Sequence, residues 1–304
     1  MVKRLHIYFK EMFPLPSRLF VSCVLFFEMY FLVILTYKDV MKMPHIGIQE
    51  FVGCVTIFAF LLSLRIADEF KDFETDKVLF PERPYPSGKV KTKDLATVLV
   101  TINATAVILN VIFMPRKSLI FYGILLGYGT LMSLWFFSKY KIQKNLILAL
   151  ITHNPIQLFI NLYIIAFACI KYNIPLISFT NVVIMFTLYF PGLIYEVSRK
   201  TRAPQDETDY VTYSKLWGYK KATKFILAVM FFDMITSSIL VYKLLPVAVV
   251  TVIASYFWLV KKCFDFMKDP TKFKLLKKME IYEYITEGSV IVIEAVYIFT
   301  RYIL

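Results

Sequence analysis

Nine apolar runs, each about 20 residues long, decide what this sequence can fold into. A bilayer core about 30 Å thick needs roughly 20 apolar residues for one helical crossing. A helix satisfies its backbone hydrogen bonds within one segment, so runs of this length favour helices in lipid. The sequence therefore predicts an all-α integral membrane protein with nine transmembrane helices in a single domain over residues 1–304. The runs lie near residues 17–37, 47–69, 94–114, 118–138, 145–170, 176–198, 222–243, 245–264 and 283–303.

The composition supports a membrane protein and excludes several soluble classes. Hydrophobic residues make up 58% of the chain, whereas soluble domains contain about 45–50%. The net charge of +13 lies mostly in short loops between apolar runs, which favours membrane topology and anionic ligands over nucleic acid. The four cysteines are far apart and form no CxxC pair. Neither a disulfide framework nor a zinc site is therefore expected.

The basic residues are divided very unevenly between the two sides of the predicted bundle. The side of the N-terminus holds 28 of the 35 Lys and Arg residues. Because positive loops remain in the cytoplasm, the N-terminus is predicted to be cytoplasmic and the C-terminus outside. The first apolar run is too long for a signal-peptide core, and no small-residue cleavage site follows it. We expect it to be a retained helix.

The second apolar run ends in three aspartates that are four residues apart, namely Asp68, Asp72 and Asp76. On a helix this spacing places neighbouring carboxylates on one face. Like charges so close repel each other, and a bound cation would remove the repulsion. Oxygen ligands favour Mg²⁺, which also binds substrate phosphates. The alternative is a solvated helix end, because Arg65 and Lys71 lie among the acids.

A proline-rich loop follows the aspartates and carries Arg83. Its sequence is Pro81-Glu-Arg-Pro-Tyr-Pro-Ser-Gly-Lys89. The prolines restrict the backbone and Gly88 supplies a turn. Such a loop can hold Arg83 over a diphosphate, since the guanidinium group pairs with two phosphate oxygens at once. The alternative is an ordinary positive charge in a cytoplasmic loop.

The two segments together resemble the first signature of the UbiA-type intramembrane prenyltransferases. That signature is Asn-Asp-x-x-Asp-x-x-x-Asp followed by Arg-Pro-Leu-Pro-Ser-Gly, and here Asp68 and Glu69 replace its first two residues. The resemblance implies nine helices around a central cavity. It also implies Mg²⁺ as cofactor and a prenyl diphosphate that ionises to an allylic cation, which a hydrophobic acceptor attacks. The implied catalytic residues are Asp68, Asp72 and Asp76, and the implied metal ligands are Asp68, Glu69, Asp72, Asp76 and Glu196.

Four residues are predicted to bind the diphosphate. The resemblance implies Arg83 and Lys139, whereas Arg199 and Lys200 are predicted from their positive charge at a helix end that departs from the family pattern. Lys139 ends the fourth apolar run, where Trp135 replaces the family's tyrosine. The sixth run ends with Glu196, Arg199 and Lys200 instead of a second aspartate pair. Two accounts stay open. In the first, Arg199 and Lys200 neutralise the diphosphate in place of a second Mg²⁺. In the second, the later acids Asp206, Glu207 and Asp209 fold back and complete the metal site.

Two functions other than prenyl transfer stay open. An isoprenoid cyclase would use the same ionisation without an external acceptor. A transporter would use the acids inside spans, namely Glu28, Asp233 and Glu294, since intramembrane acids often mark ion paths. The phosphotransferases that act on CDP-alcohols also use spaced aspartates, but their Asp-Gly opening is missing here.

Two prolines and two glycines inside the spans predict local features. Pro155 and Pro191 are expected to kink their helices. The spacing of Gly123 and Gly127 permits close packing of two helices.

Overall fold

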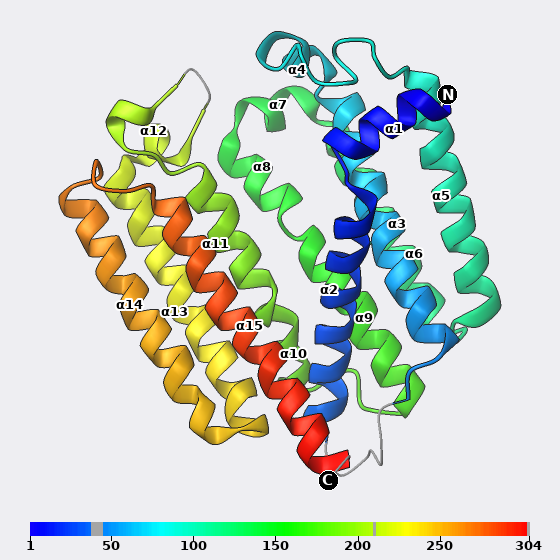
Figure 1. Cartoon of the computed structure of the whole chain (residues 1–304), viewed down its shortest axis with the longest axis vertical. Coiled ribbons are helices and arrows are strands. Elements are labelled where there is room, and N and C mark those ends of the chain that lie inside the picture. The colour runs from blue at the N-terminus through cyan, green and yellow to red at the C-terminus, as the bar shows by residue number, and fades with distance from the viewer. Residues whose placement is uncertain (38–44, 209–210, 303–304) are drawn as a thin grey trace. The chain divides into compact units, whose positions relative to one another are not determined.

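The computed structural model describes residues 1–37, 45–208 and 211–302, and every regular element in these ranges is helical (Figure 1). The all-α prediction is confirmed. The longer helices are α1 Val2–Glu11, α2 Leu15–Thr36, α3 Ile48–Lys71, α5 Thr92–Phe113, α6 Ser118–Ser133, α8 Leu146–His153, α9 Ile156–Tyr172, α10 Phe179–Thr187, α11 Tyr189–Arg199, α13 Tyr219–Leu244, α14 Val249–Lys268 and α15 Leu275–Tyr302. The shorter ones are α4 Phe73–Leu79, α7 Lys139–Lys144 and α12 Tyr213–Trp217, with 3₁₀ turns at Trp135–Phe137, Pro204–Asp206 and Pro246–Ala248.

Seven helical segments of the described chain are long and apolar enough to cross a bilayer. Of the nine predicted spans, the fourth corresponds to α6, which is apolar but only 16 residues long. The ninth corresponds to α15, which is 28 residues long but carries several glutamates. An integral membrane bundle is therefore shown, and the count of nine stays a prediction.

Two of the predicted spans are broken in the middle. The fifth divides at Asn154–Pro155 into α8 and α9, as the proline predicts. The sixth divides at Leu188 into α10 and α11, three residues before Pro191. Pro191 has no N–H to donate to the carbonyl group four residues earlier, which is that of Thr187. The break therefore lies where the missing hydrogen bond would have been.

The described residues pack into two compact units. The first comprises Met1–Tyr30 and Pro44–Lys139, and the second comprises Phe31–Met43 and Tyr140–Leu304. In the first unit, α1 packs beside the end of α3 through Tyr8, which is fully buried. A bidentate ion pair connects α1 to the start of α5. The Arg4 Nε and Nη2 atoms donate to the two carboxylate oxygens of Asp94 at 2.6 and 2.8 Å. The prediction of one domain is not tested by this division.

The second unit has its core between α11, α13, α14 and α15, which pack against one another (Figure 1). In both units many large apolar side chains remain exposed, for example Val100 and Ile108 on α5 and Phe257 on α14. Exposed apolar surface on this scale is expected where a helix faces lipid. The surface therefore agrees with the apolar runs in the sequence.

Glycines permit close packing at positions other than the predicted pair. A Cβ atom at Gly53 would lie 2.2 Å from the Phe26 ring, and one at Gly129 would lie 2.7 Å from the Phe60 ring. At Gly123 and Gly127 no heavy atom of the described residues would lie within 4 Å. The predicted pair therefore makes no close helix contact in the described structure.

We expect Gly53→Ala to destabilise the protein by about 1–3 kcal/mol, the usual cost of overpacking a core. The Phe26 ring cannot move away easily, because it is fully buried and stacks on Tyr30 at 5.8 Å. Gly123→Ala is the matched control and should be neutral or stabilising by up to ~1 kcal/mol, since alanine favours helix. Thermal unfolding in detergent measures both. A Gly53→Ala protein that unfolds at or above the wild-type temperature would contradict the packing.

Candidate functional site

The three aspartates span a break between two helices instead of one continuous helix. α3 ends at Lys71, Asp72 has dihedrals of −102° and 7°, and α4 begins at Phe73. The amide of Asp72 still donates to the Asp68 carbonyl group at 2.9 Å, and that of Asp76 to the Asp72 carbonyl group at 2.8 Å. The prediction of a single helical face is therefore wrong at Asp72, although the helical spacing continues across the break.

Three of the four predicted acids already hold a basic partner. A buried or half-buried carboxylate is costly unless it is paired, and neighbouring bases meet this need locally. The pairs are Asp68 with Lys71 at 2.7 Å, Glu69 with Arg65 at 2.6 Å and Asp76 with Arg83 at 2.9 Å. The acidic motif is thus largely a set of ion pairs, and two of the bases are Arg65 and Lys71, which the sequence analysis named only as part of a solvated helix end.

Asp72 is the remaining acid, and it has no ion pair within 4 Å among the described residues. Burial raises the pKa of the Asp72 carboxyl above its ordinary value, while the nearby charge of Lys71 acts in the opposite direction. Asp68 and Asp76 raise this pKa further, and Lys139 lowers it. Lys139 therefore lies within electrostatic range of Asp72, and its role in binding a diphosphate stays a prediction.

Lys71 and Trp135 belong to this site but were missed as site residues. The Lys71 ammonium group lies 4.7 Å from the centre of the Trp135 ring, and the side chain is 7% exposed. Trp135 begins a turn of three residues with left-handed dihedrals, at φ of 53°, 47° and 57°. Such a conformation is costly for residues with a Cβ atom. The turn also places Lys139 at the first position of α7.

The loop that carries Arg83 is closed by its own backbone hydrogen bonds. Its backbone closes through bonds from the Ser87 amide to the Arg83 carbonyl group and from the Val90 amide to the Pro84 carbonyl group, both at 3.0 Å. Gly88 adopts a φ of 75° in the turn. The Arg83 guanidinium group lies 3.8 Å over the Phe80 ring while it binds Asp76. The loop therefore holds Arg83 at the acidic motif.

The donor chemistry of this motif fits a magnesium ion in part. The Glu69 Oε2 atom is buried without a hydrogen-bond partner among the described residues. In the same residues, no three acids, histidines or cysteines come together as a ready metal site. Mg²⁺ commonly takes one or two carboxylates, with water and substrate phosphates completing its shell. The carboxylates fit that kind of shared site.

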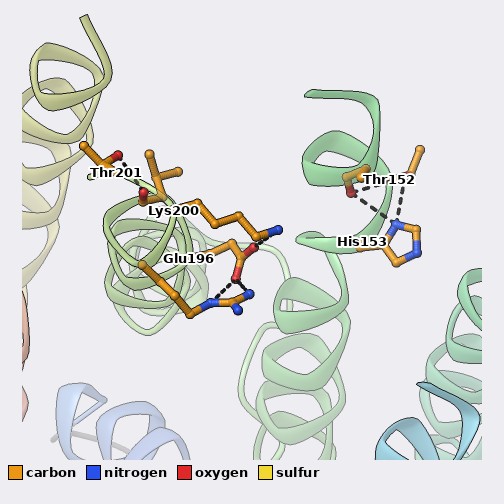
Figure 2. Close-up of polar contacts among 8 residues, drawn as sticks. Thr152, His153, Glu196, Lys200 and Thr201 are labelled. Carbon is orange, nitrogen blue, oxygen red and sulfur yellow. Dashed lines mark hydrogen bonds and ion pairs between the residues drawn. The ribbon is translucent and has the colours of Figure 1, made fainter. Parts of the chain in front are cut away.

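In the second unit, Glu196 lies between two bases at the end of α11 (Figure 2). Its Oε2 atom accepts hydrogen bonds from Arg199 at 3.1 and 2.5 Å, and its Oε1 atom pairs with Lys200 at 2.9 Å. The Thr201 hydroxyl group donates to the Val197 carbonyl group at 2.8 Å and extends the helix end. The local charge is positive, which suits an anion better than a metal.

The loop acids have different environments. The Glu207 carboxylate accepts a hydrogen bond from the Thr212 hydroxyl group at 2.7 Å, and Thr212 in turn caps α12 by accepting from the Lys215 amide at 3.1 Å. Asp206 is exposed. Asp209 lies outside the described residues. Glu207 therefore organises its own loop, and the account in which loop acids complete the site stays a prediction.

The acids inside the spans are buried, and Asp233 has a clear structural partner. The Tyr282 hydroxyl group donates to its Oδ2 atom at 2.7 Å, and both side chains are fully buried. Glu28 and Glu294 are 5% and 4% exposed. The Asp233 contact fastens α13 to α15 and gives this acid a structural role.

No protein-family model matches the sequence, and no curated protein is similar to it in sequence. A solved structure of digeranylgeranylglyceryl phosphate synthase, a UbiA-type prenyltransferase of membranes, superposes with a TM-score of 0.65. The match covers 97% of this chain and 99% of the synthase. The chain has the UbiA-type prenyltransferase fold. At 16% identity, this finding concerns the fold and not the roles of single residues.

The contact between Asp233 and Tyr282 can be tested with matched substitutions. Tyr282→Phe leaves a buried carboxyl without its donor and should destabilise the protein by about 1–3 kcal/mol. Tyr284→Phe is the control, because Tyr284 is 78% exposed. The double variant Asp233→Leu/Tyr282→Phe should recover most of the loss, since both polar groups are removed. Thermal unfolding gives the values. Equal unfolding temperatures for the two tyrosine variants would argue against a structural role.

Proposed function

We propose that this protein is a Mg²⁺-dependent prenyltransferase. It transfers the prenyl group of an isoprenoid diphosphate to a hydrophobic acceptor inside the membrane. The observation that carries the proposal is the paired acid–base motif at the end of α3, beside the rigid Arg83 loop, in a chain with a prenyltransferase fold. The named synthase supports prenyl transfer in general, and the acceptor here is left open.

The ion pairs explain how the site would receive its substrate. Asp68, Glu69, Asp72 and Asp76 would hold the metal ion, and Arg83, Lys71 and Lys139 would turn to the phosphate oxygens. Arginine suits this exchange because its planar group binds two phosphate oxygens at once. When bound, Mg²⁺ would neutralise charge on the leaving diphosphate. The carbon–oxygen bond then breaks toward the diphosphate, the acceptor bonds to the prenyl carbon, and the acceptor loses a proton.

The basic residues at the end of α11 enter the proposal through their charge and through the resemblance alone. Arg199 and Lys200 would bind the diphosphate in place of a second metal ion, and Glu196 would position them through the contacts described above. This account follows from the basic surroundings of Glu196. Its role as a metal ligand is the less favoured alternative, because both of its oxygens are occupied by bases.

The membrane topology is part of the same proposal. Nine spans would put the N-terminus and the acidic motif at the cytoplasmic face and the C-terminus outside. Two observations support this. Besides the seven helical segments that are long and apolar enough to cross a bilayer, helices α6 and α15 occupy the positions of the fourth and ninth predicted spans. The basic residues lie mostly on the proposed cytoplasmic side.

Product analysis decides between transfer and cyclisation. Purified protein is incubated with Mg²⁺ and prenyl diphosphates of several chain lengths, with and without a membrane lipid extract. Mass spectrometry should find a prenylated product that requires the extract. A cyclic hydrocarbon formed without the extract would favour a cyclase, and no diphosphate release under any condition would refute both enzymes.

We predict that Asp72→Asn lowers Mg²⁺-dependent diphosphate release by at least 100-fold, the usual effect of losing a charge-stabilising group. Asp72 is the half-buried acid without an ion pair among the described residues, so its loss leaves no base unpaired. Glu74→Gln is the control, because Glu74 is an exposed acid two residues later on α4. Phosphate detection after pyrophosphatase treatment measures the rate. Comparable rates in the two variants would remove Asp72 from the site.

Arg83→Gln should raise the KM for the prenyl diphosphate about tenfold or more, since a charge-assisted pair is worth about 1.5–3 kcal/mol. Lys89→Gln removes an exposed charge from the same loop and should leave the KM near the wild-type value. Initial rates at varied diphosphate concentration give both constants. An unchanged KM in Arg83→Gln would show that the Arg83 side chain forms an ion pair with Asp76 and does not bind the diphosphate.

A further inference from the structure

A cavity of about 360 Å³ opens in the first unit beside α1, α2 and α3. Its apolar wall includes Phe13, which follows α1, Val21 on α2, and Leu61 and Leu64 on the last part of α3. One water molecule needs about 10–15 Å³ of such space, so the cavity has room for many water molecules. This is enough for a polar head group and the first carbons of a chain.

Two arginines, Arg18 and Arg65, also line this cavity. Arg18 is exposed, lies 5.8 Å from the Phe13 ring centre and makes no ion pair among the described residues. Arg65 binds Glu69, but its Nε atom is buried without a hydrogen-bond partner among the described residues. The wall therefore offers one uncompensated positive charge and one donor in need of an acceptor.

The negative charge on this wall is compensated from outside the cavity. Asp68 lines the cavity, and Lys71 neutralises it at 2.7 Å. Arg18 lies in the first turn of α2. The helix dipole also favours an anion near this end of the helix. The electrostatics of the cavity thus favour a negatively charged head group.

The cavity is adjacent to the diphosphate motif without coinciding with it. Asp68 lines the cavity, whereas Asp72, Asp76 and Arg83 are not among the described residues that line it. A ligand here would lie on the side of Asp68 that faces α1 and α2. This position leaves the Asp76–Arg83 pair available for another ligand.

We propose that this cavity binds the head group of an anionic phospholipid, with its phosphate on Arg18 and the Nε atom of Arg65. Basic pockets between membrane helices on the cytoplasmic side commonly bind such head groups. The apolar wall then receives the first carbons of the acyl chains. The inference does not depend on the proposed reaction, because it concerns a lipid that is bound and not consumed.

Native mass spectrometry tests the proposal with purified full-length protein. The protein is equilibrated in micelles that contain equal amounts of dioleoyl phosphatidylglycerol and dioleoyl phosphatidylcholine, which differ in the head group alone. The protein should retain phosphatidylglycerol preferentially. Arg18→Gln should lower this retention about fivefold, which is the usual contribution of one basic side chain, and Arg18→Lys should keep part of it.

Lys10→Gln is the matched control, because it removes an exposed positive charge from α1, away from the cavity wall. Its retention should equal that of the wild type. Equal retention of both lipids, or equal losses in Arg18→Gln and Lys10→Gln, would overturn the proposal. Displacement of the lipid by geranylgeranyl diphosphate with Mg²⁺ would also overturn it, because the cavity would then belong to the prenyl donor. Retention is measured without turnover, so an inactive enzyme leaves the result unaffected.

Discussion

Charge compensation at the end of α3 is the interaction on which the rest of the site depends. Within nine residues the chain places five acids, and four of them, all except the exposed Glu74, are the acids of the predicted site. Four isolated carboxylates there would be prohibitive. Lys71 and Arg65 supply partners from the same helix, and Arg83 supplies one from the following loop. This explains why the loop must be stiff, since a mobile arginine would leave Asp76 uncompensated for much of the time.

Several local features of the first unit serve this compensation. The break at Asp72 separates the acids on α3 from Asp76 on α4, which is the acid that meets the loop. The left-handed turn that begins at Trp135 places an aromatic face under the Lys71 ammonium group. Tyr8 of α1 is buried close to Arg65 and Glu69, which interact electrostatically with its hydroxyl group, and burial raises the pKa of that hydroxyl group. Helix α1 therefore packs against the end of α3 that carries the acids.

The sequence predicted the helical membrane fold, the acidic motif and the rigid loop, because each rests on a local pattern. Apolar length predicts spans, and three prolines within six residues restrict any backbone. The ion pairs were harder to foresee, since Lys71 was interpreted as part of a solvated end and not as a buried partner. The turn at Trp135 could not be predicted, because nothing in Trp-Phe-Phe favours left-handed dihedrals. The break at Leu188 is the kink that Pro191 predicts, and it lies three residues before the proline because Pro191 has no N–H to donate to the Thr187 carbonyl group.

The balance of charge also constrains the order of events in the proposed reaction. Asp68, Glu69, Asp72 and Asp76 are matched by an equal number of nearby bases, namely Arg65, Lys71, Arg83 and Lys139. A metal ion that bound alone would release bases with no anion to receive them. A diphosphate that bound alone would strip the acids of their partners. When both arrive together, each released group gains a new partner, so the two ligands should bind with positive coupling. The three ion pairs are therefore suited to exchange partners when a metal ion and a diphosphate bind together.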